Sequence, residues 1–409
     1  MSQAFDVCIR GAGIVGRTLA LMLARERLRV ALVPQAAPAP GAELTTAHSQ
    51  ENAGPPQGFL SPSGGGPGAA WTSGHSDVRA YALNTASRNI LVALRCWPDP
   101  ADATPVTAMQ VYGDDGGEVR FDATGPHEDA LAWIVDVPAL ERRLAEAVRY
   151  QPAIEVLDAP VPAGLTVVCE GKASTTRAEL GVEFETIAYA QNAIATRLVC
   201  ERKHEQIARQ WFLHGETLAF LPLGGEDGNS VAVVWSVSEG KVAERAALDD
   251  AAFAEALEQA SHGALGHLQV TGPRAAWPLQ LAEAVRFAGS HVVGGKNEGW
   301  ALAGDAAHTV HPLAGQGLNL GLGDAAELAR VLRERESWRR VGDERLLRRY
   351  ERSRKAALFA LRTATDGLQQ LFARDDPAWQ GLRNWGMKGF DSSGPLKAWV
   401  VRRAMGLNG

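Results

Sequence analysis

The residues with the clearest chemical potential lie between Gly304 and Asn319, in the run GDAAHTVHPLAGQGLN. A strand-like apolar stretch ends at Gly304, which would place Asp305 at the carboxyl edge of a sheet. A carboxylate there can accept hydrogen bonds from the hydroxyls of a sugar or ribitol chain. The segment Ala-Gly-Gln-Gly then opens a long helix, and a helix N-terminus stabilises negative charge on an electron-rich ring such as a reduced flavin.

A second motif, Gly11-x-Gly13-x-x-Gly16, lies near the N-terminus. It follows an apolar strand and opens a helix, the context in which glycines let the backbone approach a pyrophosphate. A glycine-rich turn in an unrelated α/β domain is the alternative interpretation. An acidic residue usually follows about 20 residues on to bind the ribose. Gln35 stands at that place here and could still hydrogen-bond a ribose.

Two histidines, His308 and His311, are three residues apart. No other cluster of ligands accompanies them, so we predict no metal site. We interpret His308 as a structural hydrogen-bonding residue. Ser87 and Ser174 do not lie in nucleophile-elbow sequences.

The elements that must position these residues begin with a βαβ pattern. Residues 4–10 predict a buried strand, the next stretch has helical periodicity, and residues 30–33 predict a second strand. This order implies a parallel sheet. Residues 36–76, rich in Ala, Pro, Gly and Ser, predict a mobile surface insertion rather than a third strand.

The middle of the chain predicts a second layer. Residues 106–122 favour a hairpin, and residues 182–290 alternate between strand-like runs with one helical stretch near 248–260. This pattern is typical of a mostly antiparallel sheet. Residues 300–303 return to a parallel-type strand, and the chain after Gly315 is predominantly helical.

A length of 409 residues suits two domains that share a cleft. The predicted fold class is α/β (α+β), with a Rossmann-like nucleotide-binding domain, a mostly antiparallel β-sheet substrate domain and a helical C-terminal segment. The predicted boundaries are 1–105, 136–181 and 291–330 for the nucleotide-binding domain, 106–135 and 182–290 for the substrate domain, and 331–409 for the C-terminal helices.

Composition narrows the classes of function. The four cysteines form no CxxC pair, and the chain has neither a signal-like start nor a long apolar stretch, which predicts a cytoplasmic protein. With a net charge of −6, no nucleic-acid partner is expected. Residues 330–403 hold 18 Lys and Arg against nine Asp and Glu, a local charge of +9. This segment is either a face for an anionic membrane surface or acidic partner, or a solvated helical face.

The run from Gly304 to Asn319 resembles the FAD-binding motif of class A flavoprotein aromatic hydroxylases, the para-hydroxybenzoate hydroxylase superfamily. It is similar in particular to the ubiquinone-biosynthesis branch, and the resemblance covers nearly the whole chain apart from 36–76. In the family's central Asp-Gly motif, Glu170 replaces the aspartate before Gly171. Further similar stretches are 77–80, 189–204, 210–212, 220–223, 383–384 and 395–397.

The resemblance implies roles for individual residues. Gly315, Gln316 and Gly317 should sit against the isoalloxazine ring. His311 and Pro312 should line the flavin face next to the substrate, and with Gln316 they are the candidate catalytic residues. The residues that should hold FAD are Gly11, Gly13, Gly16, Gln35, Arg79, Glu170, Gly304, Asp305, Pro312, Gly315, Gln316, Gly317, Leu318 and Asn319.

The resemblance also implies the reaction of an FAD-dependent monooxygenase. NAD(P)H would reduce FAD, oxygen would form a flavin C4a-hydroperoxide, and its distal oxygen would pass to an aromatic ring. The implied substrate is a polyprenylated phenol of ubiquinone biosynthesis, which suggests peripheral contact with the inner face of a membrane and with a biosynthetic protein complex. The alternatives are a hydroxylase of a soluble aromatic compound and a non-catalytic scaffold paralogue, which Gln35 and Glu170 could mark.

Overall fold

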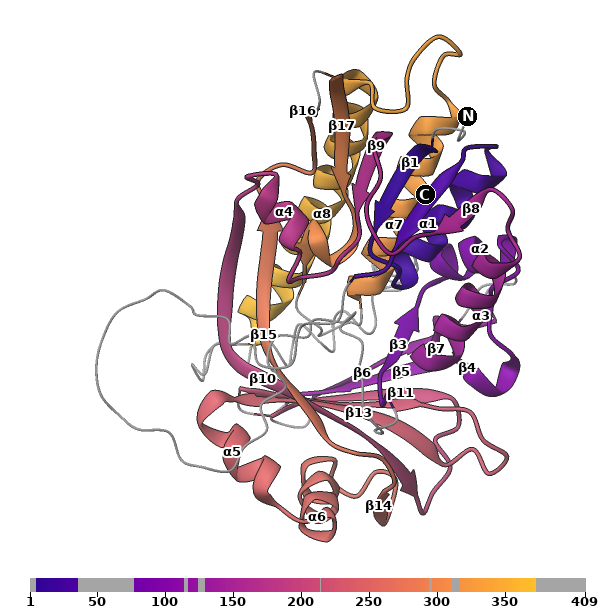
Figure 1. Ribbon diagram of the computed structural model, residues 1–409. Helices are drawn as coiled ribbons and strands as arrows, with labels where there is room; N and C mark the ends of the chain where they lie inside the picture. Colours follow the sequence, from indigo (N-terminus) through magenta and orange to yellow (C-terminus); the bar gives the residue numbers. More distant parts are fainter. Residues whose placement is uncertain are drawn as a thin grey trace.

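The computed structural model describes residues 5–35, 77–113, 117–123, 129–213, 215–293, 296–310 and 316–372. The predicted insertion at 36–76, His311, Pro312, Gly315 and the chain beyond 372 lie outside these residues. Two large sheets, one above the other in Figure 1, and a small sheet between them organise the described part.

The first large sheet is six-stranded, in the order β16-β17-β9-β1-β2-β8. All neighbours are parallel except β16 and β17. Its strands are β1 (Phe5–Arg10), β2 (Val30–Val33), β8 (Ile154–Val156), β9 (Ala163–Val168), β16 (Ala288–Val293) and β17 (Lys296–Leu302). Val7 and Ile9 of β1 face the main core and Cys8 faces a second one, so this central strand is buried on both faces.

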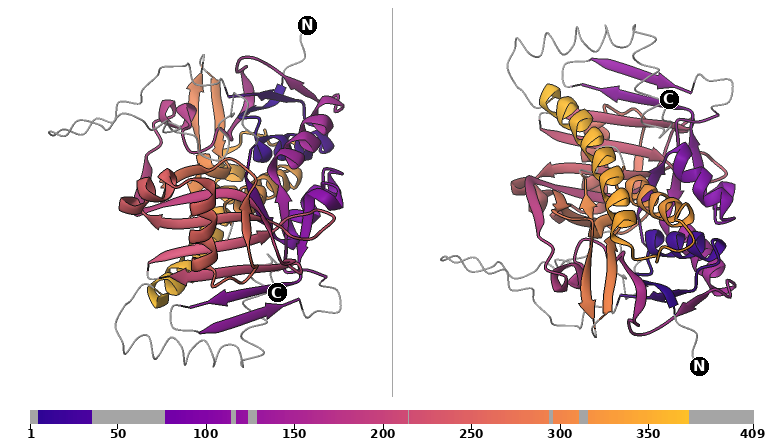
Figure 2. Two further views of the ribbon diagram at one scale, coloured as in Figure 1. Left: turned by 90° about the horizontal axis from the view of Figure 1, so that it is seen from below. Right: turned by 90° about the horizontal axis from the view of Figure 1, so that it is seen from above.

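Helices cover this sheet. Helix α1 (Ile14–Arg25) follows β1 at once and completes the βαβ unit that the sequence predicted. It packs between α3 (Val137–Arg149) and α7 (Gln316–Arg333). The long helix α8 (Glu344–Phe372) lies beside α7 and against β16, as the right view of Figure 2 shows.

A three-stranded sheet lies between the two large ones, and the sequence did not predict it. Its order is β3 (Ala80–Leu83), β7 (Ala132–Asp136) and β4 (Ala103–Val106), all antiparallel. Helix α2 (Thr85–Ala93) begins after β3, where the Asn84 side chain accepts a hydrogen bond from the backbone N–H of Ser87.

The second large sheet is nine-stranded and mostly antiparallel, as predicted. Its order is β18-β15-β10-β13-β12-β11-β5-β6, with β14 paired to β10, and only β5 and β11 are parallel neighbours within it. The predicted hairpin is confirmed by the β5–β6 pair. The strands are β5 (Ala108–Tyr112), β6 (Glu118–Asp122), β10 (Phe184–Cys200), β11 (Ile207–Leu213), β12 (Glu216–Pro222), β13 (Ser230–Ser238), β14 (Leu268–Val270), β15 (Ala275–Ala284) and β18 (His308–Thr309).

Two helices, not the single predicted one, lie on one face of the nine-stranded sheet (Figure 2, left). Helix α6 (Asp250–Ala260) buries Phe253 against Trp235, and both side chains belong to the core of this layer. Helix α5 (Glu239–Ala247) was not predicted: none of its side chains is fully buried, and its apolar positions consist of one valine, Val242, and small alanines.

The two large sheets are joined at one place. Strands β10 and β15 run from the lower sheet up beside the six-stranded one (Figure 1). The chain leaves β17 through the short 3-10 turn Gly304–Ala306 and immediately adds β18 to β15 of the other sheet. The motif around Asp305 therefore lies at the junction of the two layers.

Candidate active site

The glycine turn after β1 combines two tightly packed glycines with one open glycine. A Cβ on Gly11, where φ is +107°, would lie 2.3 Å from the Cys169 carbonyl oxygen, and one on Gly16 would lie 1.9 Å from the Gly11 carbonyl oxygen. A Cβ on Gly13 would meet nothing within 4 Å. Gly13 is also the N-cap of α1 and supplies no side chain to the free N–H groups. The helix N-terminus is thus open to an anionic ligand.

Asp305 stands at the end of β17, after Gly304 with a φ of +63°. Its Oδ2 atom is inaccessible to solvent and has no hydrogen-bond partner among the described residues. Burial raises the pKa of the Asp305 carboxyl to about 6, against the opposing positive charges of His308 and Lys172. A buried carboxylate oxygen without a partner is a group that a ligand hydroxyl could satisfy.

The two motifs, almost 300 residues apart in the sequence, meet at Val15. A Cβ on Gly304 would lie 3.2 Å from Val15 Cγ2, and one on Gly321 of α7 would lie 2.7 Å from the same atom. Since β1, β9 and β17 are consecutive parallel strands, Gly13 and Asp305 both follow the carboxyl edge of one sheet. Ligands of open α/β sheets bind at this edge.

Arg79, another residue predicted to bind the cofactor, lies in the segment just before β3. Its Nε donates to both carboxylate oxygens of Asp77 at 2.9 Å, and its Nη2 lies 3.9 Å from Glu141 Oε1. Burial would lower the pKa of Arg79, but the hydrogen bond and charge of Asp77 outweigh it and the pKa is raised. Arg79 is therefore held as a permanent cation.

The two residues that depart from the family pattern have different surroundings. Gln35 is exposed just after β2. Glu170 is buried, and its carboxylate accepts hydrogen bonds from the Ser174 hydroxyl at 2.7 Å and the Thr176 hydroxyl at 2.6 Å. Arg10 Nε lies 3.1 Å from the same carboxylate. Both carboxylate oxygens of Glu170 are thus bonded to groups of the chain itself. Any effect of Glu170 on the site is therefore indirect, through residues 170–176, which these hydrogen bonds hold in place.

The start of α7 carries the remaining predicted residues. Gln316, Gly317 and Leu318 are half-buried in its first turn, and a Cβ on Gly317 would meet nothing within 4 Å. Asn319 is buried and accepts hydrogen bonds from the Asn84 N–H at 3.0 Å and the Ser87 hydroxyl at 2.7 Å. Asn319 therefore ties α7 to α2. His311, Pro312 and Gly315 lie outside the described residues.

Lys172 is a charged group of this site that the sequence did not single out. Burial lowers the pKa of its ammonium, and the nearby charge of Asp305 opposes that shift. Tyr81, within the electrostatic reach of Arg79 and Asp305, has a pKa raised chiefly by burial. Lys172 follows Glu170 and Gly171 in the sequence, but no spacing rule connects it to Asp305.

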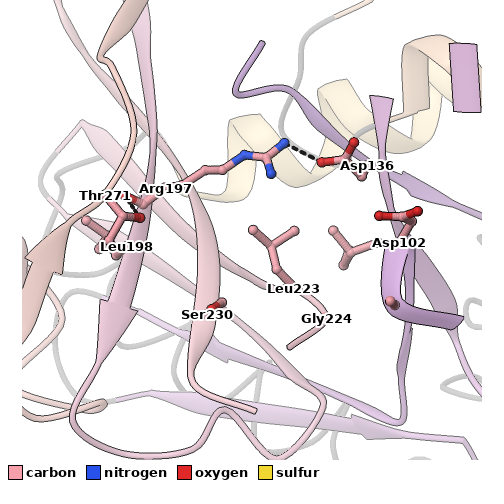
Figure 3. Close-up of a pocket in the computed structure, with 10 residues that line it drawn as sticks. Asp102, Asp136, Arg197, Leu198, Leu223, Gly224, Ser230 and Thr271 are labelled. Carbon is pink, nitrogen blue, oxygen red and sulfur yellow. Dashed lines mark hydrogen bonds and ion pairs between the residues drawn. The ribbon is translucent and has the colours of Figure 1, made fainter. Parts of the chain in front are cut away.

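A pocket of about 240 Å³ lies between β7, which contributes Ile134 and Asp136, and β10, which contributes Arg197 and Leu198. Figure 3 shows Arg197 reaching across it to Asp136, where Nη2 and Oδ2 are 2.6 Å apart. Arg197 also donates to the carbonyl oxygens of Asp77 and Val78. Arg197 and Asp136 are thus paired across the pocket, and they hold the segment that carries Arg79, so we do not take this pocket as the candidate site.

In the described part of the chain, no helix combines the length and the apolar composition that a membrane span requires. No group of three or more His, Cys, Asp or Glu side chains there is placed to hold a metal ion. His308 Nε2 donates a hydrogen bond to Asp324 Oδ2 at 2.7 Å, which confirms its predicted role as a structural hydrogen-bonding residue.

Comparison with known proteins agrees with this geometry. A family model described as an FAD binding domain matches residues 154–364. The chain is 28% identical to the ubiquinone hydroxylase UbiL of Rhodospirillum rubrum, over 98% of this chain and 89% of that protein. It is 26% identical to 3-demethoxyubiquinol 3-hydroxylase of Escherichia coli, over 99% and 100% of the two chains.

Among solved structures, p-nitrophenol 4-monooxygenase PnpA from Pseudomonas putida superposes with a TM-score of 0.70. The superposition covers 100% of this chain and 99% of that one at 18% identity, which shows a shared fold. An open Gly13, a buried carboxylate without a partner and a fixed cation at Arg79 fit a dinucleotide that carries a polyol chain.

Proposed function

Since this chain belongs to the FAD binding domain family, we propose that it is an FAD-dependent monooxygenase that hydroxylates an aromatic ring with NAD(P)H as the electron donor. The observation that supports the proposal is the meeting of the two motifs at Val15. The open glycine turn and Asp305 Oδ2, which has no hydrogen-bond partner among the described residues, thereby lie at one sheet edge. One elongated cofactor could span both.

The residues of the chain would divide the work of binding. Gly13 and the N-terminus of α1 would receive the pyrophosphate, with Arg79 beside it as a cation. Asp305 would accept hydrogen bonds from hydroxyls of the cofactor's sugar or ribitol chain. Gln316 and Gly317 would place the N-terminus of α7 against the flavin ring, together with His311, Pro312 and Gly315, which precede them in the sequence.

When bound and reduced, FAD would supply the oxygen chemistry. The chain's own contribution would be to orient the flavin and keep water away from it. The Gly304–Ala306 turn is attached to the nucleotide-binding layer on one side and to β18 of the substrate layer on the other. A flavin held at this turn would therefore lie where the two layers meet, which suits the exclusion of water.

For the substrate we propose a polyprenylated phenol of ubiquinone biosynthesis. This rests on the relatives named as ubiquinone hydroxylases, which align over nearly the whole chain. A prenylated substrate resides in lipid, so we expect peripheral contact with a membrane surface, and a pathway of this kind suits a complex of biosynthetic proteins. Co-sedimentation of the protein with anionic vesicles measures the membrane contact.

The experiment that tests the proposal is purification followed by the visible spectrum and by NAD(P)H oxidation. A yellow protein whose NAD(P)H oxidation is stimulated by a prenylated phenol, with one hydroxyl added to the ring, supports it. Stimulation by a water-soluble phenol alone would favour the soluble-aromatic hydroxylase. A colourless protein that takes up no added FAD would favour the scaffold paralogue and contradict the proposal.

A further inference from the structure

A buried charged network lies directly behind the cofactor turn. Asp324 of α7 is fully buried, and its Oδ2 accepts the N–H of Gly304 at 2.8 Å and contacts His308 Nε2 at 2.7 Å. Its Oδ1 accepts the Nε–H of Arg354 from α8 at 2.6 Å. One carboxylate thus joins three segments: the turn after β17, strand β18 and helix α8.

The charges of this network depend on one another. Burial would raise the pKa of Asp324, but the charges of His308 and Arg354 outweigh it and the pKa is lowered. Burial would likewise lower the pKa of His308, but Asp324 outweighs it and the pKa is raised. A buried charge is stable only while its partners are in place, so the network favours one geometry strongly over others.

Helix α8 contacts the same region at a second point. The Tyr350 hydroxyl donates to the Leu302 carbonyl oxygen at 2.7 Å, two residues before Gly304, and Tyr350 is fully buried. Arg354 follows one helical turn later and also donates to the Leu320 carbonyl oxygen at 3.2 Å. The turn that carries Asp305 is therefore fixed from behind by both α7 and α8.

We propose that Asp324, His308 and Arg354 are positioning residues for the cofactor, and that α8 acts on cofactor binding through Arg354. The bond from Gly304 N–H to Asp324 holds the left-handed Gly304 backbone, which sets the direction of the adjacent Asp305 carboxylate. None of the three touches the open side of Gly13. This inference rests on the proposed function, because FAD is the cofactor for which these residues would position the site.

A role in stability alone is the competing explanation, and it makes a different prediction for ligand binding. If the network only stabilises the fold, its loss lowers the unfolding temperature of the apoprotein, but FAD still binds the folded fraction with the same affinity. If it positions Asp305, the FAD dissociation constant rises even at temperatures where the variant is fully folded. The FAD-induced increase in unfolding temperature then shrinks as well.

The experiment compares FAD dissociation constants, measured by flavin fluorescence well below the unfolding midpoint of each apoprotein. Arg354→Gln should bind FAD about tenfold more weakly, because a displaced contact group loses its alignment. Arg354→Lys keeps a cation beside Asp324 and should recover most of the affinity. Arg348→Gln, which removes an exposed pair with Glu344 on the same helix, is the matched control and should bind as the wild type does.

A gentler variant covers the case in which Arg354→Gln does not fold. A Cβ on Gly323 would lie 3.2 Å from Arg354 Nη2, so Gly323→Ala displaces the guanidinium slightly while it favours helix α7. We expect Gly323→Ala to weaken FAD binding about two- to fivefold without lowering the unfolding temperature of the apoprotein. The circular dichroism of the bound flavin should change in parallel.

The outcomes separate the two proposals. Wild-type protein that binds no FAD would contradict the proposed function itself. Wild-type protein that binds FAD, with dissociation constants unchanged in folded Arg354→Gln and Gly323→Ala, would overturn the positioning role and leave the proposed function standing. Weaker FAD binding in both variants, with Arg348→Gln unaffected, supports the inference.

Discussion

A buried carboxylate oxygen without a hydrogen-bond partner destabilises the fold that carries it, and Asp305 Oδ2 is such a group within the described residues. The folded-state pKa of about 6 lies above the ordinary value of 3.8. At pH 7 the folded apoprotein must therefore keep the carboxylate ionised at a cost. This destabilisation disappears as the pH falls through 6 toward 3.8, where the folded state holds the proton more tightly than the unfolded chain.

Asp305→Asn should accordingly stabilise the apoprotein at pH 7 by on the order of 1–3 kcal/mol, because the amide has no charge to bury. The same substitution should weaken FAD binding, because Asn lacks the second acceptor oxygen. In the wild type, FAD affinity should fall below pH 6 as Asp305 takes up its proton, and the variant should lack this dependence. Thermal unfolding and FAD titrations from pH 5 to 8 measure both effects; a less stable Asn variant at pH 7 would refute the account.

Two glycines of the N-terminal turn should matter for different properties: Gly13 for FAD binding and Gly16 for the stability of the fold. Gly13→Ala should leave apoprotein stability within about 1 kcal/mol, since its Cβ points into open space and its φ of −76° suits any residue. FAD binding should weaken at least about tenfold, because the methyl group occupies the approach of the pyrophosphate. Gly16→Ala is the contrasting variant: its Cβ would overlap the Gly11 carbonyl oxygen, so stability should fall by about 3–5 kcal/mol.

These two glycine variants are compared by urea unfolding of the apoproteins and by flavin fluorescence titration. Equal loss of stability in both would show that Gly13 is a packing glycine after all. The sequence could identify the three glycines as a motif, but it could not sort them. A side chain at Gly16 is excluded by the folded turn itself, through the Gly11 carbonyl oxygen. One at Gly11 is excluded by the backbone of Cys169, more than 150 residues away.

Glu170, which stands where the family has an aspartate, is accommodated by hydrogen bonds to the start of a neighbouring helix. Its longer side chain reaches α4 (Thr175–Glu179), where it meets the N–H of Thr176 at 3.1 Å as well as two hydroxyls, and it still lies beside Arg10. Glu170→Asp should lose part of this set and about 1–3 kcal/mol of stability. Glu170→Gln keeps the reach without the charge and isolates the ion pair with Arg10. Equal stability of the wild type and the Asp variant, by urea unfolding, would contradict this account.

Helices and strands could be predicted from the sequence where they are long enough for their hydrophobic periodicity to be recognised. The β1–α1–β2 unit was predicted because a continuous apolar strand precedes a 12-residue amphipathic helix. Strand β8 has three residues and β18 has two, too few to show alternation. The β3-β7-β4 sheet is assembled from short strands that are not consecutive in the chain, and its pairing is set by tertiary contacts.

The same limit applies to the site. Gly13 and Asp305 were found from sequence because each follows a strand in a recognisable turn. Asp324, Arg354 and Lys172 were not, because their roles come from contacts between segments that no local pattern connects. Asn319 was assigned to the cofactor, and the structure shows its side chain bonded to Asn84 and Ser87.

At the scale of the whole molecule, Arg197 joins the nine-stranded sheet to the small three-stranded sheet. It belongs to β10, yet it pairs with Asp136 of β7 and donates to the carbonyl oxygens of Asp77 and Val78, just before β3. Asp136 in turn caps α3 through the N–H of Ala139 at 3.0 Å. Arg197 thus connects the substrate sheet to the segment that carries Arg79.

Arg197→Met keeps the apolar stem and removes these contacts. We expect a loss of about 1–3 kcal/mol and weaker FAD binding, because residues 77–79 lose their support from the substrate layer. Amide hydrogen exchange should accelerate at residues 77–81 and at the N-terminus of α3, while the interior of β10 stays protected. Arg202→Met, an exposed residue just after β10, is the matched control and should change none of these. Accelerated exchange confined to β10 would mean that Arg197 serves its own sheet and does not couple the two layers.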